Sequence, residues 1–199
     1  MSVRNKAAAA AIAAALAGGG LYLAAPTPPE PTGNLYVMRG LFGGKGAWFS
    51  YGVDVAADKA AKEYGLKTVV SSWRSSAAMC EMAIANYKKD RKPVYLLGHS
   101  LGGNEVADVS HCLNKAGVPV TFAFFYDPTP FVKCVPDNVK FATSWRRSFP
   151  FDLGGGYIKR CNGSGKDISN ITVQTRHTTL DDLPSVHNAT LRRIGVTLK

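Results

Sequence analysis

Residues 93–103 read PVYLLGHSLGG. The apolar first half predicts a buried strand at 93–97, and the pattern of a helix follows at 101–116. Between them lies a G-x-S-x-G motif centred on Ser100. A strand, a tight turn and a helix in direct succession place the Ser100 hydroxyl at the carboxyl end of the strand.

This turn has the features of a nucleophilic site. It is tight enough that side chains would clash, which explains glycine at Gly98 and Gly102. The helix that begins beyond Ser100 directs backbone N–H groups and its positive dipole end toward the hydroxyl. A match to the five-residue G-x-S-x-G pattern is common by chance. The interpretation therefore depends on the predicted strand before the motif and the predicted helix after it. The alternative is a strand–helix turn without chemistry.

The rest of the domain alternates short apolar runs with helical patterns. Strands are predicted at 35–38, 67–70, 93–97, 118–126, 139–142 and 171–174, and helices at 51–64, 75–89, 101–116 and 183–194. Strands separated by helices need crossover connections, which give a mostly parallel sheet with helices on both faces. The predicted fold class is therefore α/β. The segment 148–166 fits neither period and is predicted to be a loop with a hairpin.

The N-terminus has the composition of a targeting segment. A short basic region precedes an Ala-rich apolar stretch, which predicts a signal peptide or an N-terminal anchor over 1–25. Alanine partitions weakly into membranes, which favours the signal peptide. A Pro-rich linker is predicted at 26–33 and a single domain at 34–199. We therefore expect an exported protein, periplasmic or secreted, or one anchored to a membrane by the first segment.

Charge narrows the classes of partner. The formal net charge is +10 and the sequence pI is about 9.6. This charge favours anionic partners such as a lipid membrane or an envelope surface. The basic residues are dispersed and form no nucleic-acid-binding motif, so we expect no nucleic-acid partner.

Four cysteines follow the export-like segment, and they allow three disulfide pairings. Cys80 and Cys112 fall on predicted helices that flank one strand, so we expect them to be neighbours, which leaves Cys134 with Cys161. The sequence has no CxxC or HExxH motif, and no metal site is predicted.

A serine nucleophile requires a base that a third group orients. Three histidines follow Ser100. His177 comes directly after the last predicted strand, where a loop can bring the imidazole onto the serine. His111 lies on the helix after the turn and is expected at the surface, and His187 lies inside the last helix. We therefore prefer His177.

The acid is predicted to be Asp127, which ends the strand that follows the Ser100 strand and precedes two prolines. Catalytic groups gather at strand ends on this edge of a sheet. Asp152, after the next strand, is the alternative. Asp181 and Asp182 are closer to the preferred base in sequence but have the pattern of an acidic helix start.

Two backbone N–H groups are needed to hold an oxyanion. Leu101, directly after the serine, supplies one. The Gly-rich loop at 39–44 is the expected source of the second, at Leu41. Phe42 and Trp73 are candidate walls for an apolar substrate, and residues 149–151 (Phe-Pro-Phe) could form a short lid.

These motifs resemble those of one superfamily. The segment 40–43, the Gly-His-Ser-Leu-Gly-Gly turn at 98–103 and the Asp-Pro turn at 127–128 are similar to the oxyanion loop, nucleophile turn and acid turn of the α/β-hydrolases, especially small lipases and esterases. The resemblance covers the chain from about Leu35 onward. It implies a minimal α/β-hydrolase fold without a large cap domain. Arg39 stands where these enzymes commonly have a histidine.

The expected function is hydrolysis of a small-molecule or lipid ester through an acyl-enzyme on Ser100, with no cofactor. An acyltransferase or a thioesterase with the same three residues is the alternative among enzymes. A catalytically inactive binding or structural module of the cell envelope is the alternative outside enzymes.

Overall fold

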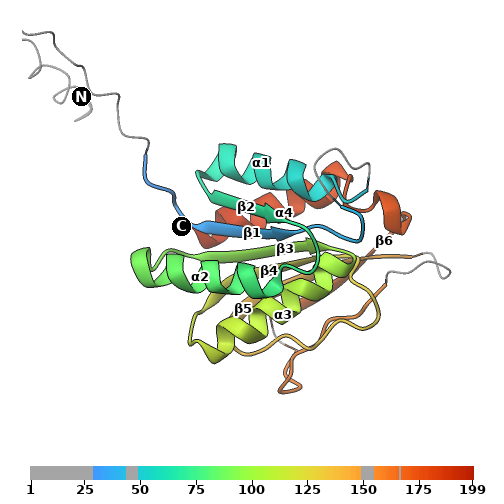
Figure 1. Ribbon diagram of the computed structural model, residues 1–199. Helices are drawn as coiled ribbons and strands as arrows, with labels where there is room; N and C mark the ends of the chain where they lie inside the picture. The colour runs from blue at the N-terminus through green and yellow to red at the C-terminus, as the bar shows by residue number, and fades with distance from the viewer. Residues whose placement is uncertain (1–28, 44–48, 149–154, 166) are drawn as a thin grey trace, which may run out of the picture.

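The computed structural model describes residues 29–43, 49–148, 155–165 and 167–199. These residues form six strands and four α-helices, with a short 3-10 turn before the last helix (Figure 1). In chain order the elements are β1 (Asn34–Met38), α1 (Gly52–Tyr64), β2 (Lys67–Ser71), α2 (Ser76–Asp90), β3 (Val94–His99), α3 (Leu101–Lys115), β4 (Val120–Tyr126), β5 (Val139–Arg147), β6 (Ile168–Val173), η2 (His177–Thr179) and α4 (Pro184–Thr197).

The six strands form one sheet in the order β2-β1-β3-β4-β5-β6, and every neighbouring pair is parallel. Helices α2 and α3 pack on one face, and α1 and α4 pack on the other (Figure 1). The predicted α/β class, with a parallel sheet covered on both faces, is confirmed. In the described part of the chain each α-helix packs on this sheet, so no separate cap domain is present there.

The central strands follow from their continuous apolar sequence. Every residue of β3 is buried, and its side chains alternate between the two faces. Tyr95 and Leu97 join the core under α1 and α4, whereas Leu96 joins the core under α2 and α3. Because parallel strands end at the same edge, the carboxyl ends of β1, β3, β4, β5 and β6 all reach one side of the molecule.

The edge of the sheet differs from the sequence prediction. Strand β6 begins at Ile168 rather than at residue 171, and β5 continues past residue 142 to Arg147. Strand β6 lies at the sheet edge and is half-exposed, so polar residues such as Asn170 occupy it without cost. The continuous apolar run that reveals a buried strand is therefore missing from the first half of β6.

Two disulfides join the expected cysteines. Cys80 of α2 is bonded to Cys112 of α3, and Cys134 is bonded to Cys161. Disulfides persist in oxidising compartments, so both bonds agree with export of the chain. The predicted targeting segment 1–25 lies outside the described residues. Among the residues that the structure does describe, no helix is both long enough and apolar enough to cross a membrane.

We predict that replacing Cys80 and Cys112 together by alanine lowers the free energy of unfolding by about 3 kcal/mol, because the bond closes a loop between cysteines 32 positions apart. Urea unfolding of the variant and the wild type measures the difference. The pair Cys134 and Cys161, 27 positions apart, should show a similar loss when it is replaced. Unchanged stability in the first variant would contradict a structural role for the bond.

Candidate active site

The turn between β3 and α3 is held by backbone-to-backbone packing. A Cβ atom on Gly98 would lie 2.1 Å from the carbonyl oxygen of Gly102, and a Cβ atom on Gly102 would lie 2.1 Å from the carbonyl oxygen of Met38. Ser100 itself has φ 57° and ψ −124°, a conformation that L-residues rarely adopt. Strain of this kind persists where the surrounding structure enforces it, and it is concentrated at functional sites.

Three predicted residues meet at the carboxyl edge of the sheet. The Nε2 atom of His177 lies 2.8 Å from Oγ of Ser100, and its Nδ1 atom lies 2.7 Å from Oδ2 of Asp127. The Asp127 carboxylate can only accept, so with a neutral imidazole Nδ1 carries the hydrogen and Nε2 accepts from the serine hydroxyl. All three residues are buried. They follow β3, β4 and β6. Because β5 separates β4 from β6, the loop after β6 carries His177 back along the sheet edge to Ser100.

The Asp127 carboxylate is held by more than the histidine. Its Oδ1 atom accepts the backbone N–H of Arg147 at 3.1 Å and that of Gly155 at 2.7 Å. The buried guanidinium of Arg147 lies beside the other oxygen, with Nε 3.5 Å from Oδ2. These contacts orient the carboxylate. Sequence reasoning missed Arg147, because the strand was predicted to end at residue 142 and Arg147 is the last residue of β5 in the structure. Asp152, the alternative acid, lies outside the described residues.

The loop after β1 approaches Ser100 as expected. A Cβ atom on Gly40 would lie 3.0 Å from Cβ of Ser100, so the backbone of this loop contacts the serine directly. The guanidinium of Arg39 binds Asp54 of α1 through Nε at 2.9 Å and Nη2 at 2.7 Å, which fixes the start of the loop. Leu41 follows at once, and its N–H stays the predicted second oxyanion donor beside that of Leu101.

The residues predicted to bind substrate lie on loops at the same edge. Phe42 follows Leu41 and is 82% exposed. Trp73 follows β2 and is half-buried, with the Arg74 guanidinium 4.2 Å above its ring. Their contact with a substrate stays a prediction. The lid predicted at 149–151 lies outside the described residues.

The two other histidines that follow Ser100 in the sequence, His111 and His187, bind backbone carbonyls away from the serine. His111 Nε2 donates to the carbonyl of Cys134 at 2.9 Å, and His187 Nε2 donates to the carbonyl of Asp181. His111 also lies near the sulfurs of Cys134 and Cys161. Because both sulfurs are used in a disulfide, this group does not offer the thiolates that a metal ion would need.

Asp181 is not the acidic start of a helix that the sequence indicated. It precedes α4 and is buried, and its Oδ2 atom accepts the N–H of Gly52 at the start of α1. Burial, with a smaller effect from the charge of Asp182, raises the pKa of Asp181 to about 7. Its Oδ1 atom faces Nδ1 of His99 at 3.6 Å.

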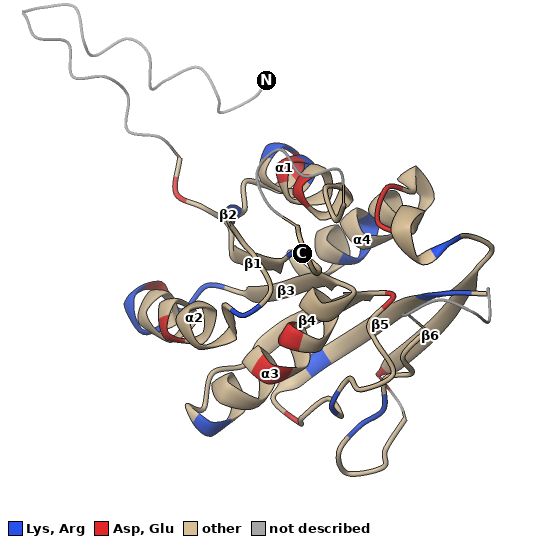
Figure 2. Cartoon of the chain, turned by 45° about the vertical axis from the view of Figure 1, so that its right-hand side comes forward, with Lys and Arg blue, Asp and Glu red and all other residues tan. Residues whose placement is uncertain are grey.

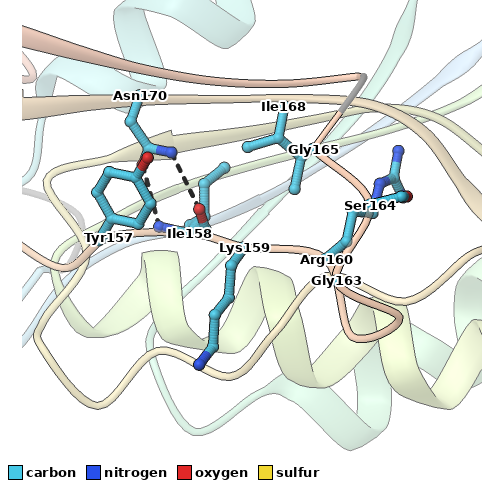
Figure 3. Close-up of a pocket in the computed structure, with 9 residues that line it drawn as sticks. All are labelled: Tyr157, Ile158, Lys159, Arg160, Gly163, Ser164, Gly165, Ile168 and Asn170. Carbon is cyan, nitrogen blue, oxygen red and sulfur yellow. Dashed lines mark hydrogen bonds between the residues drawn. The ribbon is translucent and has the colours of Figure 1, made fainter.

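Among the described residues, hollows are also lined by residues other than Ser100, His177 and Asp127. One, of about 300 Å³, is lined by the turn that contains Gly163 and Gly165, by residues 157–160 and by two residues of β6, one of which, Asn170, pairs with the backbone of Ile158 (Figure 3). The other, of about 390 Å³, is lined by Ser148, Gln174, Thr175, Arg176 and Thr179. This second hollow borders the His177 loop, and the residues that line it are of polar or charged types.

No protein-family model matches the sequence, and no curated protein matches it. Solved structures do match. The RedJ thioesterase of the prodiginine pathway in Streptomyces coelicolor has a TM-score of 0.51 at 11% identity, over 88% of this chain and 96% of that chain. Human thioesterase 2 has a TM-score of 0.53 at 12% identity, over 82% of this chain and 97% of that chain.

A third similar structure comes from Xanthomonas campestris and is described as belonging to the α/β-hydrolase superfamily. Its TM-score is 0.50 at 14% identity, over 85% of this chain and 98% of that chain. At these identities the likeness shows the fold alone. The chain therefore has the α/β-hydrolase fold, as the resemblance implied.

We predict that Gly98→Ala destabilises the protein by about 3 kcal/mol, because the new methyl group would overlap the backbone of Gly102. Gly165→Ala is the matched control, since a Cβ atom there meets nothing within 4 Å. Thermal and urea unfolding measure both variants. Equal stability of the two variants would contradict the close packing at the turn.

We predict that Asp181→Asn becomes more stable relative to the wild type as the pH rises from about 4 to about 7. In the wild type the pKa of Asp181 is higher in the folded protein than in the unfolded chain. The stability that this group contributes is therefore fully present below its unfolded-state pKa and is lost as the pH rises through its folded-state pKa. Asparagine does not titrate, and the relative gain should reach up to about 4 kcal/mol.

Urea unfolding at each pH measures this difference, with Asp182→Asn as the control because that neighbour is exposed. The control should keep most of the pH dependence of the wild type. Parallel curves for Asp181→Asn and the wild type would show that Asp181 titrates normally in the folded protein.

Proposed function

We propose that this protein is a serine hydrolase that cleaves carboxylic esters through an acyl-enzyme on Ser100. The observation that carries the proposal is the chain of contacts from Ser100 to His177 to Asp127, at 2.8 and 2.7 Å. A serine hydroxyl is a weak nucleophile unless a base can take its proton, and this geometry provides that base.

The first step forms the acyl-enzyme. Oγ of Ser100 attacks the ester carbonyl carbon while Nε2 of His177 takes the hydroxyl proton. Asp127 keeps the imidazole in the correct orientation and stabilises its charged form. The N–H groups of Leu101 and Leu41 hold the oxygen that becomes negative. His177 then gives the proton to the departing alcohol as the carbon–oxygen bond breaks.

The second step releases the acid. His177 takes a proton from water, the resulting nucleophile attacks the acyl carbon, and the bond to Ser100 breaks as the proton returns to Oγ. Arg147 contacts the same carboxylate oxygen that Asp127 offers to the histidine. The guanidinium and the imidazole therefore approach the same oxygen, and both hold the carboxylate in place.

A thioester is the second candidate substrate. The reaction needs the same three groups, and two of the similar structures are described as thioesterases. Thiolates leave more easily than alkoxides, so the choice depends on substrate contacts rather than on the nucleophile. Hydrolysis rates for an ester and a thioester with the same acyl chain separate the two.

The setting that we propose is the cell envelope or the exterior. Two disulfides and the net charge of +10 support an exported protein that meets anionic surfaces. Figure 2 shows Lys and Arg spread over several helices and loops, so the attraction would be general rather than confined to one patch.

We predict that a fluorophosphonate probe labels the wild type and that Ser100→Ala abolishes labelling, because the probe reacts with an activated serine. Asp127→Asn should lower kcat about 10³- to 10⁴-fold, because the wrong histidine tautomer is then held. Gel fluorescence and hydrolysis of a p-nitrophenyl ester measure these effects.

Asp152→Asn is the control for the acid and should retain most activity. If Asp152→Asn caused the larger loss, the acid would be reassigned to that residue. A folded wild type that does not label would favour the inactive envelope module instead.

A further inference from the structure

A second buried polar group lies behind the proposed triad. His99, the residue before Ser100, is fully buried, and its ring centre lies 5.0 Å from that of His177. Ser50, which precedes α1, is also buried and lies with Oγ 2.5 Å from Nδ1 of His99. The motif G-x-S-x-G leaves its second position open, so the sequence gives no role to this histidine.

The hydrogen-bond directions in this group follow from its two ends. Nε2 of His99 lies 3.0 Å from the carbonyl oxygen of His177, which can only accept, so Nε2 carries the hydrogen. Burial lowers the pKa of His99 to about 3, so the ring is neutral and Nδ1 accepts from the Ser50 hydroxyl. Oγ of Ser50 in turn accepts the N–H of Gly40 at 3.0 Å.

The result is a continuous chain of three hydrogen bonds. It runs from the N–H of Gly40 through Ser50 and His99 to the backbone carbonyl of His177. At one end is Gly40, which directly precedes Leu41, the proposed oxyanion donor. At the other end is the backbone carbonyl of His177, the proposed base. The chain therefore ties together the two loops that must face each other across Ser100.

This group is not a second catalytic triad. The Asp181 carboxylate faces Nδ1 of His99 at 3.6 Å, which is the same nitrogen that Ser50 uses. A relay needs the acid and the hydroxyl on opposite nitrogens of the ring. Ser50 is also 1% exposed, so no substrate reaches it.

The backbone at Ser50 supports a role for its side chain. Its φ is 60°, in the left-handed region where glycine is favoured and serine is strained. A residue that only closed a turn here would be less strained as glycine. The hydroxyl supplies what glycine lacks, an acceptor for Gly40 and a donor for His99.

We propose that Ser50 and His99 are positioning residues. They hold the loop after β1, which carries Leu41, in register with the loop after β6, which carries His177, across Ser100. This inference rests on the proposed function and deepens it. Misplacing a backbone donor weakens binding of the transition state more than binding of the ester, so the effect falls on kcat rather than on KM.

The test measures variants of this group by hydrolysis of a p-nitrophenyl ester and by thermal unfolding. Ser50→Ala and Ser50→Gly both remove the hydroxyl, and we expect each to lower kcat roughly tenfold to hundredfold with little change in KM. Ser50→Gly should unfold at a higher temperature than Ser50→Ala, because glycine accepts the positive φ. Loss of activity then follows the hydroxyl and not the stability.

Ser110→Ala is the matched control. Ser110 is a buried serine of α3 whose hydroxyl bonds the carbonyl of Val106, away from both loops. It should keep the kcat of the wild type within about twofold. If Ser50→Gly had the same kcat as Ser110→Ala, the positioning role would be overturned while the proposed hydrolase remained.

His99→Gln combined with Ser50→Ala tests whether the two residues act through one chain. We expect the double variant to have about the same kcat as the less active of the two single variants, Ser50→Ala and His99→Gln. The reason is that breaking one link already disconnects the loops. Multiplicative losses would overturn a shared chain. A folded wild type that neither hydrolyses the ester nor labels with a fluorophosphonate would overturn the proposed function itself, which separates the two failures.

Discussion

The structure depends on how closely the backbone packs at the turn between β3 and α3. Gly98 and Gly102 leave no room for a single methyl group, and Met38 of the neighbouring strand closes the same space. This packing holds Ser100 at a positive φ and points its hydroxyl out of the sheet edge. The strain at Ser100 is stable because central strands on both sides, and a helix behind it, leave the chain no other path.

The parallel sheet converts this local constraint into a site. Because all six strands run in one direction, the segments after β1, β3, β4 and β6 reach the same edge although they are far apart in sequence. Asp127, like Ser100, has a positive φ, 44°, and Phe42 and Ser50 share this property. These four positions lie on loops that converge around the serine, as is common at functional sites. Arg74, after β2, and Arg91, at the end of α2, also have a positive φ.

Buried polar groups around the serine are arranged in a way that limits their energetic cost. The Asp127 carboxylate receives two backbone N–H groups, a histidine and a nearby guanidinium, so its charge is compensated. His99 avoids a charge altogether, because burial keeps it neutral. Asp181 is compensated least, which is why burial raises its pKa. These buried polar groups thus lie where the loops meet at the carboxyl edge of the sheet.

The sequence by itself determined the α/β class and the turn at Ser100, because buried strands and tight glycine turns are local features that composition and spacing reveal. It predicted His177 and preferred Asp127 to Asp152 from their places after strand ends. It did not reveal the edge strand β6 in full, since a half-exposed strand has no continuous apolar run. Only the tertiary structure decided the roles of Arg147, Ser50, His99 and Asp181. The partners on which these roles depend lie 10 to 129 positions away along the chain, and such contacts arise from the packing of elements that no local pattern records.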